Sequence, residues 1–202
     1  MAPVRAGLSR RPPVAGAVLA GGSSRRFGAD KSVAQTPSGP LAGIAIRALR
    51  EAAVDPVVLI GATAEASARL AVPSIPDRLP GEGPLAGVWT ALTWASGVHR
   101  VVVVPCDMPR IDASVVRTLM KSGDNSTAAV GSVDGEVHPI VGCWPVSWAA
   151  DINELIRSGQ RRMSAILDVG DVNVVEFGQF EMADADDPAE LVNLIESVEG
   201  LE

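Results

Sequence analysis

Short apolar runs alternate with longer stretches of helical periodicity along most of the chain, and this alternation limits the possible folds more than any other feature. The apolar runs lie at 14–20, 57–60, 101–104, 127–130 and 172–177. The helical stretches lie near 41–53, 84–95, 112–121, 147–157 and 187–198. Such alternation is typical of a mostly parallel sheet with helices on both faces. The sequence therefore predicts an α/β fold, a Rossmann-like three-layer sandwich.

Size and composition fit one such domain. A chain of 202 residues with 47% hydrophobic and 20% charged residues buries enough apolar surface to offset the entropy of ordering, which excludes a disordered chain. We expect a single domain over 14–202 and a flexible N-terminal segment over 1–13. Stretches rich in Pro and Gly at 35–40 and 73–84 are interpreted as connections inside that domain.

The charge balance narrows the possible partners. Seventeen basic and 24 acidic residues give a net charge of -7, which disfavours a broad electrostatic grip on nucleic acid or on an anionic membrane. The apolar run at 14–20 is too short to span a membrane, so we expect a cytoplasmic protein. Cys106 and Cys143 lack paired CxxC spacing, which predicts buried free thiols rather than a zinc site or a disulfide.

The loop after the first strand, LAGGSSRRFGADK from Leu19 to Lys31, has the composition of an anion-binding loop. Its glycines let the backbone present N–H groups to phosphate oxygens, and Arg26 and Lys31 supply the charge that a triphosphate requires. The spacing matches neither GxxxxGK[ST] nor GxGxxG, so a P-loop and a dinucleotide-binding turn are excluded. The alternative is a glycine-rich turn that carries surface arginines.

A second loop follows the continuous apolar strand at 101–104 and reads PCDMPRI. Ligands of open α/β sheets bind outside the carboxyl ends of the strands, so both loops should open on one edge. A carboxylate in this position can reach a divalent cation that is bound to phosphate oxygens. Asp107 is therefore the candidate metal ligand, and a local turn or helix cap is the alternative.

In this order the two loops resemble those of the molybdenum cofactor guanylyltransferases, a family of nucleotidyltransferases. The first loop matches LAGGxSxRxGxDK, with Phe27 where the family commonly has Met, and CDMP resembles the metal-binding aspartate. The resemblance implies a sheet of the nucleotide-diphospho-sugar transferase type. It also implies nucleotide contacts by Leu19, Ala20, Gly21, Gly22, Ser24, Arg26, Gly28, Lys31 and Asp107.

The segment from 77 to 88 resembles the family's aspartate, short turn and GPLAG. It implies contacts on the guanine side by Asp77, Gly83, Pro84 and Leu85. A carboxylate that accepts from a base N–H discriminates guanine, because burying an unmatched donor is costly. The alternative is that Asp77 only closes the turn before Pro80.

Three later segments resemble the acceptor side of the family. HPIVGCWP at 138–145 resembles a His-Pro strand and SGQRRMSAILD at 158–168 an arginine segment, so His138, Arg161 and Arg162 are candidate acceptor contacts. A hydrogen-bonded structural histidine and an exposed helix start are the alternatives. Asp184 and Asp186 stand where the family usually has Asn. They either cap the last helix or join Asp107 around the metal.

The resemblance implies transfer of GMP from GTP to molybdenum-bound molybdopterin, with release of pyrophosphate. Mg²⁺ on Asp107 and the cations Arg26 and Lys31 would carry the catalysis. Transient contact with cofactor-biosynthesis or acceptor proteins is expected, and nucleic acid and membranes are not. Two alternatives stay open: a nucleotidyltransferase with another base or acceptor, of the cytidylyl or sugar-phosphate type, and a catalytically inactive nucleotide-binding protein.

Overall fold

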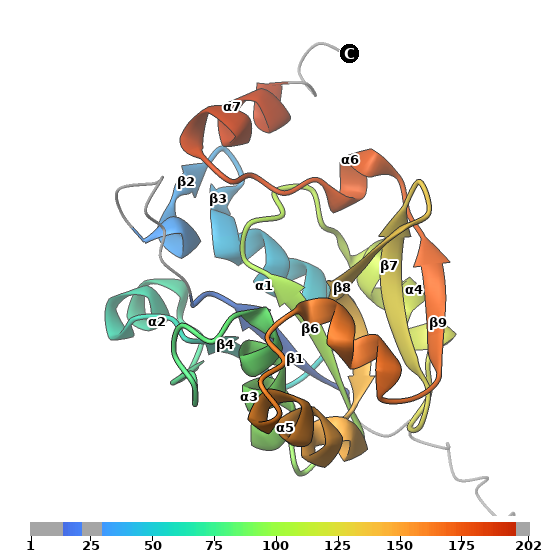
Figure 1. Cartoon of the computed structure of the whole chain (residues 1–202). Coiled ribbons are helices and arrows are strands. Elements are labelled where there is room, and N and C mark those ends of the chain that lie inside the picture. The colour runs from blue at the N-terminus through green and yellow to red at the C-terminus, as the bar shows by residue number, and fades with distance from the viewer. Residues whose placement is uncertain (1–13, 22–29, 197–202) are drawn as a thin grey trace, which may run out of the picture.

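A seven-stranded sheet in the order β5-β4-β1-β6-β8-β7-β9 forms the centre of the computed structural model, which describes residues 14–21 and 30–196 (Figure 1). Strand β8 runs antiparallel to both of its neighbours, β6 and β7, whereas the other pairings in this sheet are parallel. The strands are β1 Val14–Leu19, β4 Val57–Ile60, β5 Ser74–Ile75, β6 Arg100–Pro105, β7 Ala128–Val133, β8 Glu136–Pro145 and β9 Val172–Glu176. The mostly parallel sheet is thus confirmed.

Helices cover both faces of the sheet and complete the three layers (Figure 1). One apolar core lies between the sheet and helices α1 (Leu41–Glu51) and α4 (Ala113–Ser122), and it also receives Met182 and Leu191 from the C-terminal helices. The second core lies under α3 (Pro84–Trp94) and α5 (Ala149–Arg157). Every residue of β6 is buried, as its continuous apolar pattern predicts for a central strand. The three-layer sandwich is therefore confirmed.

Several elements have no counterpart among the periodic stretches. Helix α2 (Ala64–Leu70) buries only Ala66 and so carries little apolar periodicity. The stretches taken as connections contain a two-stranded hairpin, β2 (Gln35–Thr36) with β3 (Gly39–Pro40), and the edge strand β5. Most of β8 was expected only from the family resemblance at 138–145. The remaining elements are the 3₁₀ turns η1 Lys31–Val33, η2 Val146–Trp148 and η3 Met163–Asp168 and the helices α6 Gln179–Met182 and α7 Pro188–Glu196.

One further expectation, that for the two cysteines, is met. Cys106 and Cys143 are buried free thiols, and burial raises the pKa of Cys106 to about 12 and that of Cys143 to about 11. In the part of the chain that the structure describes, no helix is both long and apolar enough to cross a bilayer.

Candidate active site at the carboxyl edge of the sheet

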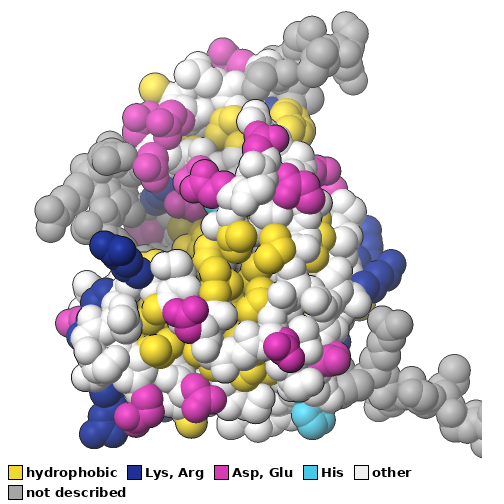
Figure 2. Space-filling model, turned by 45° about the vertical axis from the view of Figure 1, so that its right-hand side comes forward, with side chains coloured by type: hydrophobic (Ala, Val, Ile, Leu, Met, Phe, Trp, Pro, Cys, Tyr) yellow, Lys and Arg dark blue, Asp and Glu magenta, His cyan; other side chains and the backbone are white. Residues whose placement is uncertain are grey.

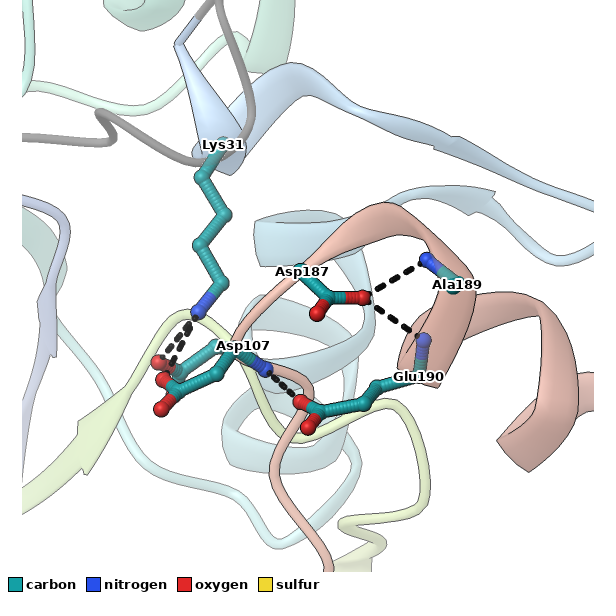
Figure 3. A network of polar contacts seen from close by, with 6 residues as sticks. Lys31, Asp107, Asp187, Ala189 and Glu190 are labelled. Carbon is teal, nitrogen blue, oxygen red and sulfur yellow. Dashed lines mark hydrogen bonds and ion pairs between the residues drawn. The ribbon is translucent and has the colours of Figure 1, made fainter.

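The loops that follow β1 and β6 meet at the carboxyl edge of the sheet. The Nζ atom of Lys31 lies 2.9 Å from Oδ2 of Asp107 (Figure 3). The Cys106 amide donates to the Leu19 carbonyl at 3.0 Å. Both charged side chains are largely buried, with 12% and 23% of their surface exposed. Two residues 76 positions apart, each singled out in the sequence, are thus brought into one ion pair.

Asp30 fixes the start of the short turn η1 that carries Lys31. Its Oδ1 accepts from the backbone amide of Ser32 at 3.0 Å and from the Ser32 hydroxyl at 2.6 Å. Its Oδ2 accepts from the Thr63 hydroxyl at 3.2 Å. Asp30 therefore acts as a cap that orients the backbone of Lys31 rather than as a ligand, and Thr63 is a supporting residue that the sequence did not single out.

A third segment, 183–187, joins the site from the far end of the chain. The Ala185 amide donates to the Asp107 carbonyl at 2.9 Å, and Asp186 Oδ1 lies 3.8 Å from Lys31 Nζ. The sequence left open whether Asp184 and Asp186 cap the last helix. The capping residue is Asp187, whose Oδ1 accepts from the amides of Ala189 at 2.8 Å and Glu190 at 2.9 Å (Figure 3).

Asp184 shows the electrostatic character of this corner. Its pKa is raised because it is partly buried and because the Asp107 charge lies nearby; Asp186 adds to the effect and Lys31 opposes it. Figure 2 shows acidic side chains gathered at the end of the molecule where α6 and α7 lie. Like charges held this close lose their repulsion when a cation binds between them.

The donor set suits a hard divalent cation only in part. Carboxylate oxygens are the ligands that Mg²⁺ and Mn²⁺ prefer. Among residues 14–21 and 30–196, however, no three Asp, Glu, His or Cys side chains are already arranged as a metal-ligand set. Asp107 and one neighbour therefore fit a cation that takes its remaining ligands from water and from a phosphate chain, as magnesium commonly does.

The backbones of β1 and β4 approach each other closely where the first loop begins. The Ala20 amide donates to the Ile60 carbonyl at 2.9 Å, and Gly61, at φ +75°, lies against Gly21. A Cβ on Gly61 would lie 2.8 Å from the Gly21 Cα and 3.7 Å from the Asp77 Cβ. Gly61 thus links the first loop to Asp77. The strand-Gly pattern at 57–61 is the sequence signal that could have revealed it.

Asp77 has structural bonds at one oxygen. Its Oδ1 accepts from the Leu79 amide at 3.1 Å and from the Thr90 hydroxyl at 3.2 Å, so Asp77 does close the turn, and its role toward a base stays a prediction. Both of these hydrogen bonds are accepted by Oδ1. Within the described residues, Oδ2 is therefore the oxygen that can accept a hydrogen bond from a ligand. Thr90 was not singled out in the sequence.

The turn after Asp77 leads into α3 as the sequence predicted. Pro84 is its first residue, preceded by Gly83 at φ +87°. Leu85 is fully buried in the core, so a side-chain contact to a base is excluded and only its backbone can face a ligand.

The candidate acceptor residues His138, Arg161 and Arg162 come from two different parts of the chain, strand β8 and the segment before η3. Arg161 forms an ion pair with Glu82 and donates to the carbonyls of Ile156 at 2.7 Å and Gln160 at 2.8 Å, so it ties η3 to the turn before α3. Arg162 immediately precedes η3. His138 lies on β8 opposite Gly131 of β7. Four predicted loop residues, Gly22, Ser24, Arg26 and Gly28, lie outside the described residues.

A three-layer fold with a cation and carboxylates meeting at the carboxyl edge is the arrangement expected of an α/β nucleotidyltransferase. Residues 16–174 match the family described as the MobA-like NTP transferase domain, and the chain belongs to this family. It is 36% identical over 173 residues to the molybdenum cofactor guanylyltransferase of Rhizobium leguminosarum bv. trifolii, covering 83% of this chain and 80% of that relative.

Solved structures agree on the fold. The molybdopterin-guanine dinucleotide biosynthesis protein A of Archaeoglobus fulgidus superposes with a TM-score of 0.69 at 22% identity, over 92% of this chain and 98% of that one. A Methanothermobacter nucleotidyl transferase superposes with a TM-score of 0.76 at 14% identity, over 94% and 99% of the two chains. The fold is thus that of the nucleotide-diphospho-sugar transferases.

Proposed function

We propose that this nucleotidyltransferase transfers GMP from GTP to molybdenum-bound molybdopterin, with Mg²⁺, and releases pyrophosphate. The single observation that carries the proposal is the contact between Lys31 and Asp107, because it joins the two loops that would hold one metal-bound triphosphate. The name of the Rhizobium relative supports the choice of base and acceptor.

Binding of the triphosphate would use the backbone and the cation of the first loop. The amides that follow β1 would donate to phosphate oxygens, and Gly21, at the start of this stretch, is exposed. Lys31 would turn from Asp107 toward the phosphates as the leaving pyrophosphate gains charge, and Arg26 would act beside it.

Asp107 would hold the magnesium ion, with Asp184 or Asp186 beside it. When bound, the ion supplies neutralisation of the charge on the α-phosphate. Without a cation this acidic end of the molecule would repel a triphosphate. The acidic residues would therefore bind the metal, and the bound metal would let the triphosphate approach them.

Guanine selection would fall to Asp77. Its Oδ1 accepts hydrogen bonds from the Leu79 amide and the Thr90 hydroxyl, and these bonds fix the carboxylate. Its Oδ2 would then accept a hydrogen bond from an N–H group of the base. The acceptor phosphate is already ionised, so the reaction needs no strong general base, and His138 and Arg162 are assigned to acceptor binding rather than to proton transfer.

A direct assay tests the proposal. The purified protein is incubated with GTP, Mg²⁺ and molybdenum-bound molybdopterin, and pyrophosphate release is measured together with formation of the dinucleotide. A parallel thermal-shift series with GTP, CTP, ATP and UTP reports base preference, because a ligand that binds only the folded state raises the melting temperature. Release with CTP but not GTP would contradict the guanine assignment.

A further inference from the structure

Arg110 contacts both flanks of the segment that carries Asp184 and Asp186. Its NH2 group donates to the carbonyl of Leu194 and, at 3.3 Å, to that of Ile195, near the end of α7. Its guanidinium carbon lies 4.4 Å from the ring centroid of Phe180 in α6. Helix α6 precedes the segment 183–187 and α7 follows it (Figure 1). The Arg110 side chain therefore contacts the chain on both sides of the two carboxylates.

Arg110 and the candidate metal ligand Asp107 lie in the same loop, the one that follows β6. Arg110 follows Asp107 by three positions, and the backbone of Asp107 is itself bonded to Ala185 in the middle of the segment 183–187. Three attachments thus join the loop after β6 to the C-terminal segment: one at each flank and one at the centre.

The side chain of Arg110 makes contacts that a solvated surface arginine does not make. Its Nε is buried with no hydrogen-bond partner among the described residues, and burial lowers the pKa of the group. The Phe180 ring is 50% exposed and takes its cation on the ring face. Cations near the last carbonyls of a helix are favourable, which fits the bonds to α7.

The contacts of Arg110 act against an electrostatic repulsion within the site. Asp184 and Asp186 carry the same charge as Asp107, and repulsion would push their segment away from the loop. The segment also has apolar anchors, since Met182, Ala185 and Leu191 are buried in the core. Folding of the segment therefore has support besides Arg110, and the contacts of Arg110 at both flanks act against the repulsion.

We propose that Arg110 is a positioning residue that holds Asp184 and Asp186 close enough to Asp107 to act on the same metal-bound triphosphate. The proposal rests on the proposed function and deepens it. Arg110 touches no reacting atom: it acts through the two carboxylates, as residues behind metal ligands commonly do.

The test measures metal binding directly. Mn²⁺ is titrated into the folded protein at fixed GTP, and free Mn²⁺ is followed by its electron paramagnetic resonance signal. We expect Arg110→Leu to weaken Mn²⁺ binding about 10-fold, as is typical when a group behind a metal ligand is lost. Arg110→Lys keeps the charge but loses the planar guanidinium, so its affinity for Mn²⁺ should lie between those of the wild type and Arg110→Leu. Arg117→Leu is the control, because Arg117 also donates to a backbone carbonyl, that of Glu51, on an exposed surface.

A double-mutant cycle separates positioning from general support. If Arg110 acts through Asp186, then Asp186→Asn should weaken Mn²⁺ binding in the wild type and add little in the Arg110→Leu background. Additive effects, or unchanged Mn²⁺ affinity in a destabilised Arg110→Leu protein, would overturn the proposal. A folded wild type that binds no Mn²⁺ with GTP would instead refute the proposed function.

Discussion

Gly61 lies so close to Gly21 that a Cβ on Gly61 would come within 2.8 Å of the Gly21 Cα. Gly61 directly follows β4 and Gly21 lies two residues after β1, so both glycines lie at the carboxyl edge of the sheet. Positive φ at Gly61 adds a second requirement for glycine. The geometry of the candidate nucleotide loop therefore depends on a residue that lies 40 positions after Gly21 in the sequence.

Gly61→Ala should destabilise the protein by about 2–4 kcal/mol, from the strained left-handed backbone together with overpacking against Gly21. Gly135→Ala is the matched control, since Gly135 has φ +80° and an added Cβ there meets no atom within 4 Å. It should cost only the backbone term, about 1–2 kcal/mol. Urea unfolding measures both, and equal losses would contradict the contact.

Lys31→Ala should lower the turnover number by roughly 10²–10³, as expected when a donor that stabilises transition-state charge is lost. Lys121→Ala is the control, because Lys121 lies in the last turn of α4 beside Arg100, at the opposite edge of the sheet. Initial rates of pyrophosphate release give both values. Turnover at the wild-type level would remove Lys31 from the mechanism.

Much of the fold could be predicted because central strands and amphipathic helices leave periodic signals. The runs at 57–60 and 101–104 lie inside β4 and β6, and helix starts such as Pro84 carry local cap chemistry. The short elements escaped prediction because α2 buries one residue and β5 has two. Their conformation follows from neighbours that are distant in the sequence.

In the site, too, some features have a local sequence signal and others depend on residues that are distant in the sequence. The meeting of Lys31 and Asp107 followed from the rule that strand ends share an edge. The choice between capping and site for Asp186 could not be made in the sequence, because Asp187 is an equally good cap one position later. Thr90 acts through a contact across the fold, which leaves no local pattern, whereas Gly61 directly follows a strand and that pattern alone does not show what it contacts.

Asp124 should make stability depend on pH in acid. Amide donation from Ser126 and Thr127 lowers its pKa to about 2, from an ordinary value of 3.8. A carboxylate with a depressed pKa stabilises the fold above its unfolded pKa, and this contribution is lost as pH falls from 3.8 toward 2. Asp124→Asn keeps the turn acceptor but cannot titrate, so its stability should fall less steeply over that range. Urea midpoints from pH 5 to 2 test this, and parallel curves would contradict it.

Asp107→Asn should remove metal-dependent binding of GTP while leaving the fold intact. The variant loses one of the clustered negative charges, so repulsion with Asp184 falls, and Lys31 keeps Asp186 at 3.8 Å as a partner. These changes oppose each other, and we expect the loss in the free energy of unfolding to stay below the roughly 3–5 kcal/mol that breaking a buried ion pair costs. Asp112→Asn is the control in the same loop: Asp112 caps α4 through the amides of Ser114 and Val115, and asparagine caps equally well. Thermal shifts with GTP, with and without Mg²⁺, should show a magnesium-dependent rise for wild type and Asp112→Asn and none for Asp107→Asn. A full magnesium response in Asp107→Asn would place the metal elsewhere.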